Sequence, residues 1–143
     1  MSSSVLHHSS TTILTLHPRR VRAARKTRKA SICSSRDAAI GFTGMDFETA
    51  VRERIPILSI LMNNFSMAIE LKVMPVATEK YRSTDISGHY ANFAQALGGY
   101  GERVTEPEQI VPAIRRGIEK TREGTPALLE FITEKAVDVS RFV

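Results

Sequence analysis

Two side chains with oxygen atoms lie where predicted strands end and helices begin, and they are the residues best suited to bind a ligand. Asp37 precedes the small residues Ala38 and Ala39, and Asn64 follows an apolar run at 57–62. In a doubly wound sheet, ligands bind at such points because helix N–H groups without partners favour anions there. A carboxylate and an amide at neighbouring strand ends suit an octahedral Mg²⁺ that also holds phosphate. The small side chains would let the backbone approach that phosphate.

The elements that must position these residues begin at Asp37. Short continuous apolar runs bounded by turn residues are typical of strands buried on both faces. Amphipathic stretches that end at proline or glycine are typical of helices. The expected strands are 57–62, 100–104 and 127–132, and the expected helices are 43–54, a helix starting over 66–71, 87–97 and 105–123. Residues 72–86 are expected to form a loop with little regular structure.

This alternation predicts an α/β fold, a Rossmann-like doubly wound parallel sheet. A parallel sheet also needs strands before Asp37, and 29–35 reads as a poor candidate because its apolar residues are only Ala30, Ile32 and Cys33. We therefore expect an incomplete domain.

The first 36 residues differ in composition from the rest of the chain. They hold eight of the 20 Lys and Arg residues and none of the 15 acids, whereas 37–143 has a net charge of −3. Twelve of the 36 are Ser or Thr. A segment with so few apolar residues cannot offset its ordering entropy. The sequence thus predicts a disordered, basic, Ser- and Arg-rich leader at 1–36 and a partial α/β domain at 37–143.

Three interpretations of the leader remain open. It has the composition of an organelle transit peptide, it could be a basic arm for a polyanion, or it is unrelated sequence joined to the domain. The expected location is cytoplasmic, or an organelle if 1–36 is a transit peptide. No apolar run approaches the roughly 20 residues of a membrane helix, so no membrane partner is expected. Nucleic acid is not an expected partner either, because aromatic residues make up 6% of the chain and Trp is absent.

The candidate site residues stand in an order that resembles a known family. Its thiamine diphosphate signature is a GDG-type turn followed at a fixed distance by paired asparagines, and Asp37 and Asn64 are 27 positions apart, as in that pattern. The matching segments are 37–45, the asparagine pair 63–64, 93–98 and 124–130. Residues 37–143 are thus similar to the distal part of the C-terminal, diphosphate-binding domain of thiamine diphosphate-dependent enzymes such as acetolactate synthase. Arg36 and Ala38 stand where the family usually has glycines.

The resemblance implies thiamine diphosphate and Mg²⁺ as cofactors and gives a role to each matching residue. The Mg²⁺ ligands would be the Asp37 carboxylate, the Asn64 side-chain oxygen and the backbone carbonyl of Ser66. Ala38 and Ala39 would offer backbone N–H groups to the diphosphate. The first asparagine of the pair, at position 63, would support the turn.

The resemblance also implies a lyase or synthase that acts on a 2-keto acid such as pyruvate and assembles as a homo-oligomer. Relatives activate the cofactor with a glutamate, and no residue here matches it, because Glu48, Glu53 and Glu70 read as solvated helix residues. The catalytic residue is therefore unknown. His89 reads as an exposed histidine at a helix start, and Cys33 is given no role. The alternative function is a catalytically inert fragment or an interaction module of such an enzyme.

Overall fold

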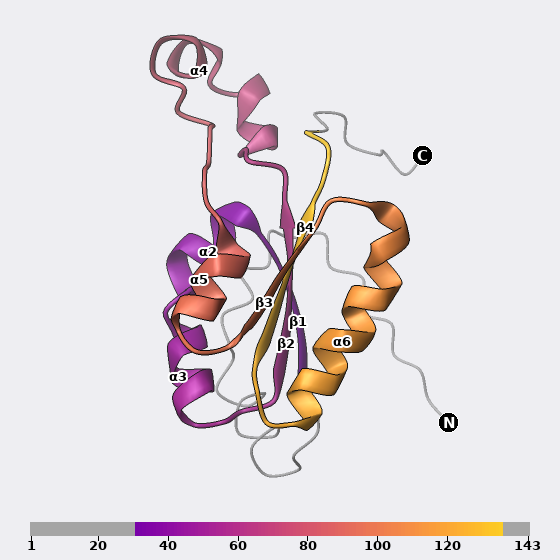
Figure 1. The fold of residues 1–143 in the computed structure, drawn as a ribbon. Helices are drawn as coiled ribbons and strands as arrows, with labels where there is room; N and C mark the ends of the chain where they lie inside the picture. The colour runs from indigo at the N-terminus through magenta and orange to yellow at the C-terminus, as the bar shows by residue number, and fades with distance from the viewer. Residues whose placement is uncertain (1–30, 136–143) are drawn as a thin grey trace, which may run out of the picture.

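The computed structural model describes residues 31–135, which form a single sheet of parallel strands with helices on both faces (Figure 1). The strands are β1 Ser31–Arg36, β2 Ile57–Asn63, β3 Tyr100–Val104 and β4 Ala127–Ile132. Their order across the sheet is β1-β2-β4-β3, so β2 and β4 are the inner strands. The predicted α/β parallel sheet is confirmed.

The helices divide between the two faces of the sheet. They are α2 Asp37–Thr43, α3 Asp46–Arg52, α4 Pro75–Tyr81, α5 Tyr90–Ala96 and α6 Ile110–Arg122, with short 3₁₀ turns η1 Ala68–Lys72 and η2 Pro107–Gln109. Figure 1 shows α2, α3 and α5 on one face and α6 on the other. None of the helices within 31–135 has the length and apolar character needed to cross a membrane.

Apolar side chains on both faces of the inner strands form the core. On one face, Leu58 and Leu129 pack with Ala113 of α6. On the other, Leu61 and Leu128 pack with the helical residues Ile40, Phe47 and Ala94. Burial on both faces explains why β2 and β4 are continuous apolar runs rather than alternating ones. Gly98 and Gly124, with φ of 89° and 86°, make the tight turns that lead from helices into β3 and β4.

The edge strand β1 corrects the expected boundary between Arg36 and Asp37. Residues 31–36 pair in parallel with β2 from Ser31–Ile57 to Arg36–Met62, so they belong to the sheet and not to a disordered leader. Cys33 is buried in this strand against Ala50 and Ile57. The expectation for 1–30 lies outside the described residues.

Two helical segments also differ from the expectations. The helix expected over 43–54 is shorter, as α3 Asp46–Arg52, and the helix α2, which was not expected, precedes it and ends at Gly44. Residues 75–81, expected to be loop, form α4, which begins with Pro75 in its first turn. This helix has no buried residue and projects beyond the carboxyl ends of the strands (Figure 1). Without a buried face, α4 lacks the amphipathic pattern by which a helix is recognised in a sequence.

The close contact of α5 with β3 is expected to depend on Gly101. A Cβ atom on Gly101 would lie 1.9 Å from the Ala91 carbonyl oxygen, which is backbone and cannot rotate away. We expect Gly101→Ala to lower the free energy of unfolding by about 3 kcal/mol, measured by urea denaturation. In the matched control Gly41→Ala, the new Cβ has no atom within 4 Å, and stability should hold or rise. Equal stability of the two variants would contradict this packing.

Candidate functional site

The parallel pairing of β1 with β2 brings two of the predicted site residues to one edge of the sheet. Arg36 and Met62 are in register at the ends of these strands. Asp37 follows β1 directly and begins α2, and Asn64 follows β2. Because parallel strands end at the same edge, both side chains lie at the carboxyl end of the sheet.

A single backbone N–H joins these two side chains. The N–H of Ser66 lies 3.1 Å from Oδ2 of Asp37 and 3.0 Å from Oδ1 of Asn64, and it donates to both. Phe65, with a φ of 56°, adopts the left-handed conformation that turns the chain back toward Asp37. The structure therefore brings together the three residues predicted to bind Mg²⁺.

The carboxylate of Asp37 is a buried negative charge without a cationic partner. Its side chain belongs to a residue that is 3% exposed, and its contacts are the N–H groups of Ala38, 2.9 Å from Oδ1, and of Ser66. Within residues 31–135, no Lys, Arg or His side chain pairs with it. A buried carboxylate is costly unless a positive charge compensates it. The site therefore has the electrostatic character of a cation site.

The donors predicted for a phosphate are only partly available. The Ala38 N–H already donates to Asp37. Ala39 lies in the first turn of α2, where backbone N–H groups have no acceptor within the helix. Both alanines are half-buried.

The first asparagine of the pair supports the turn, as predicted. Asn63 is fully buried, and its Oδ1 accepts a hydrogen bond from the N–H of Phe65 at 2.9 Å. Its Nδ2 donates to Oε1 of Glu130 at 2.7 Å. Asn63 thus ties the turn to the neighbouring strand β4.

Glu130, which is buried, and Arg103, which is partly exposed, form an ion pair that the sequence analysis missed. Glu130 is 0% exposed, and Arg103 binds it with Nε at 3.0 Å and Nη2 at 2.8 Å. Burial raises the pKa of Glu130, but hydrogen bonds from Arg103, Ala91 and Asn63 outweigh it and lower the pKa overall. The sequence feature that could have indicated this pair is Glu130 itself, the one charged residue in the apolar run of β4.

Two carboxylates, Asp37 and Glu130, act on the hydroxyl group of Tyr90 at this edge of the sheet. The pKa of Tyr90, at the start of α5, is raised by burial and then by the charges of Asp37 and Glu130. Arg103 neutralises only one of these two carboxylates. The remaining charge favours binding of a cation.

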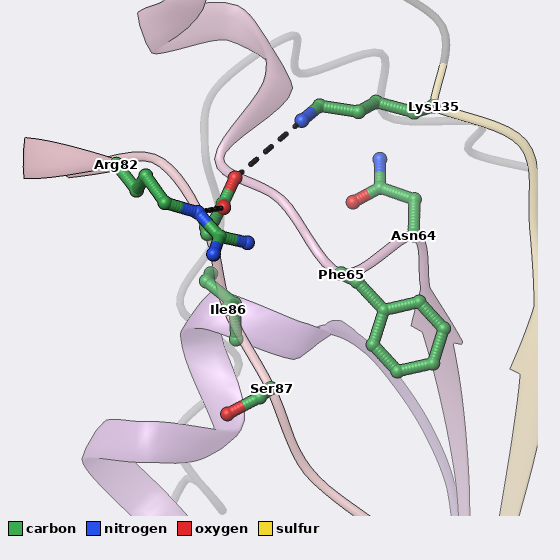
Figure 2. Close-up of a pocket in the computed structure, with 7 residues that line it drawn as sticks. Asn64, Phe65, Arg82, Ile86, Ser87 and Lys135 are labelled. Atoms are coloured by element: carbon green, nitrogen blue, oxygen red, sulfur yellow. Dashed lines mark hydrogen bonds and ion pairs between the residues drawn. The ribbon is translucent and has the colours of Figure 1, made fainter. Parts of the chain in front are cut away.

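A cavity of about 400 Å³ adjoins the site on the side of Asn64 (Figure 2). Phe65 and Ile86 give it apolar surface, and Ser87 adds a hydroxyl group. Arg82 and Lys135 both reach toward the Asp85 carboxylate, at 2.7 and 3.7 Å. Asp85 also lines the cavity, so its carboxylate pairs with both cationic side chains there.

Two of the other residues considered from the sequence, His89 and Glu48, form no hydrogen bond or ion pair with Asp37, Asn64 or Ser66 in the described part of the chain. His89 is exposed and precedes α5, as predicted. Glu48 pairs with Arg52 on α3. Among the described residues, no group of three His, Cys, Asp or Glu side chains could hold a metal ion. The candidate ligands at Asp37, Asn64 and Ser66 are not such a group, because they combine one carboxylate with an amide and a backbone carbonyl.

Comparison with known families gives one match that covers most of the chain. Residues 20–131 match the family described as thiamine pyrophosphate enzyme, C-terminal TPP binding domain. The match begins before the described residues and includes β1, so the similarity extends further toward the N-terminus than residue 37.

Curated relatives and solved structures agree with that family. A probable acetolactate synthase of Mycobacterium bovis is 32% identical over 111 residues, which are 73% of this chain and 19% of the relative. The 2-hydroxyacyl-CoA lyase 1 of Mus musculus is 29% identical over 113 residues, 72% of this chain and 19% of the relative. The chain thus spans about a fifth of these relatives. A thiamine diphosphate-dependent 4-hydroxybenzoylformate decarboxylase of Rhodococcus jostii shares the fold, with a TM-score of 0.68 and 18% identity over 85% of this chain and 23% of that one.

The hydroxyl group of Thr84 is a buried oxygen without a hydrogen-bond partner next to Ser66. Thr84 is 0% exposed, and its carbonyl accepts hydrogen bonds from Ser66 Oγ and the Met67 N–H. Replacing an unpaired buried hydroxyl by a methyl group removes a desolvation cost. We therefore expect Thr84→Val to keep or raise the Tm of the chain without ligand, measured by circular dichroism. The control Thr121→Val removes a hydroxyl that donates to the Ile118 carbonyl, and its Tm should fall. A lower Tm for Thr84→Val than for the unmodified chain would show that the Thr84 hydroxyl already has a hydrogen-bond partner.

Proposed function

Because the chain belongs to the family of thiamine pyrophosphate enzymes and contains its C-terminal TPP-binding domain, we propose that it anchors the diphosphate of thiamine diphosphate through Mg²⁺. The protein ligands of the cation are the Asp37 carboxylate, the Asn64 side-chain oxygen and the Ser66 backbone carbonyl. The Ala39 N–H would be available to the diphosphate, and the Ala38 N–H would be available only without its present hydrogen bond to Asp37.

The observation that carries this proposal is the uncompensated carboxylate of Asp37 beside the Asn64 amide. Both side chains offer hard oxygen atoms, which Mg²⁺ prefers, and both are held toward the same Ser66 N–H. Mg²⁺ keeps several sites for water and phosphate when only a few protein oxygens bind it. The donor set therefore fits a cation shared with a diphosphate.

Bound in this way, thiamine diphosphate supplies the carbanion chemistry by which 2-keto acids are cleaved or joined. The residues of this chain bind and orient it: Asp37 and Asn64 fix the cation, and the turn at 63–66 fixes their separation. We assign no catalytic residue within 31–135. Glu130, the most buried carboxylate near the site, is held by Arg103, and its hydrogen bonds lower its pKa, which favours the ionised form.

The names of the relatives support a finer proposal. An acetolactate synthase-like lyase or synthase would act on a 2-keto acid such as pyruvate, and it would work as a homo-oligomer. The cavity beside Asn64 has an apolar wall, which suits the alkyl part of such a substrate, while its two cationic side chains already pair with the Asp85 carboxylate.

The cation site is tested by calorimetric titration of the full chain with thiamine diphosphate, with and without Mg²⁺. Removing an outer-shell partner of a metal ligand costs about 10–100-fold in affinity, so removing a ligand should cost no less. We expect Asp37→Asn and Asn64→Ala each to weaken the Mg²⁺-dependent binding by at least about tenfold.

The control for charge is Glu123→Gln, which removes a carboxylate that pairs with Lys120 after the end of α6. Binding by this variant should equal that of the unmodified chain. Unchanged binding in both site variants would refute the ligand assignment.

A second candidate function is a non-catalytic module that pairs with another chain. The observation that favours it is the projecting segment of η1 and α4, where Val73, Val76 and Tyr81 expose apolar surface. Exposed apolar patches of this kind often mark interaction sites. Such a module could complete the cofactor site only with its partner.

An assay for pyruvate consumption distinguishes the two candidates. An enzyme should turn over pyruvate when the purified chain is given thiamine diphosphate and Mg²⁺. A non-catalytic module should show no turnover at any cofactor concentration, whether or not it binds the cofactor. Turnover by the purified chain would exclude the module.

A further inference from the structure

Glu130 is the point at which three segments of the fold meet. Its carboxylate accepts hydrogen bonds from Asn63 at the end of β2, from the Ala91 N–H of α5 at 3.0 Å, and from both Nε and Nη2 of Arg103 on β3. Arg103 Nη2 also donates to the Gly88 carbonyl at 2.9 Å. The carboxylate therefore links β2, β3 and the start of α5 at the edge of the sheet that carries the candidate site.

The link from Glu130 continues into the turn that carries the candidate ligands. Asn63 donates to Glu130 with its amide nitrogen and accepts from the Phe65 N–H with its amide oxygen. The Arg103 guanidinium also lies 5.9 Å from the centre of the Phe65 ring, within the range of a cation–π contact. Phe65 stands between Asn64 and Ser66, so both contacts restrict the backbone from which these two residues reach the site.

We propose that Glu130 and Arg103 are positioning residues of the cation site, and that they act through Asn63 on the turn at 63–66. This inference rests on the proposed function for its consequence, the affinity for Mg²⁺. Its structural part, the restriction of the turn, can be measured without any cofactor.

The physical argument is that an ion pair with a fully buried carboxylate, Glu130, and a partly exposed guanidinium, Arg103, is a poor choice for stability alone. Desolvation of two charges often cancels their attraction, and apolar residues of similar volume do as well or better. Every other residue of β4 is apolar, so an apolar side chain at position 130 would match its neighbours along the strand. A carboxylate differs from an apolar side chain in forming directional hydrogen bonds, and its two oxygen atoms hold four donors in defined positions.

The test uses two variants of the full chain and their combination. Glu130→Gln leaves at least one of the four donors without its acceptor. Asn63→Ser cuts the link to the turn and leaves the Arg103–Glu130 pair in place. The matched control is Glu102→Gln, which weakens the other Arg–Glu pair of β3, with Arg116, away from the turn. Arg103→Lys, which replaces a two-point contact by a single ammonium, stands in if Glu130→Gln does not fold.

The first measurement is amide hydrogen exchange in the chain without cofactor. We expect the Phe65 and Ser66 amides to exchange faster in Glu130→Gln and in Asn63→Ser, and to be unchanged in Glu102→Gln. Unchanged exchange of these two amides in Glu130→Gln or Arg103→Lys would overturn the inference.

The second measurement is the Mg²⁺ concentration for half-maximal binding of thiamine diphosphate. We expect this concentration to rise about 10–100-fold in Glu130→Gln and in Asn63→Ser, but not in the control Glu102→Gln. The double variant should be no weaker than Asn63→Ser alone, because both residues act on one turn. Additive losses would mean that Glu130 acts only on general stability and would overturn the inference. Absence of binding by the unmodified chain would refute the proposed function instead, and hydrogen exchange alone would then decide whether the network restricts the turn.

Discussion

The shared hydrogen bond of the Ser66 N–H is the contact on which the candidate site depends. It exists because β1 and β2 run parallel and end in register, so that Asp37 and the turn at 63–66 start from the same edge of the sheet. The left-handed conformation of Phe65 then directs the Ser66 N–H at both side chains. A shift of one residue between β1 and β2 would separate Asp37 from the turn, so the pairing of an edge strand sets the geometry of the site.

Parts of the fold could be predicted from the sequence because their signal is local. β3 and β4 have the bounds expected from their apolar runs, and β2 is one residue longer. β1 was missed because an edge strand buries little, and only Cys33 of its six residues is fully buried. The helix α4 was missed for a related reason, since no side chain of it is buried and no apolar face marks it.

Part of the candidate site could likewise be predicted from the sequence, and part of it could not. The proximity of Asp37 and Asn64 follows from a general property of parallel sheets and could be predicted from where the strands end. The role of Glu130 could not, because it depends on which strands are neighbours. Arg103 is in register with Glu130 only because β3 lies beside β4, and Asn63 reaches Glu130 only because β2 lies on its other side. A strand order of β1-β2-β4-β3 leaves no trace in the local pattern of residues.

The two buried carboxylates at this edge of the sheet show why the cation is assigned to one of them. Glu130 receives two hydrogen bonds from a guanidinium, and its charge is neutralised within the fold. Asp37 receives hydrogen bonds from backbone N–H groups alone, which stabilise a carboxylate but leave its net charge. The raised pKa of Tyr90 reflects both charges, after the larger effect of burial. A cation bound between Asp37 and Asn64 would give Asp37 the compensation that Arg103 already gives Glu130.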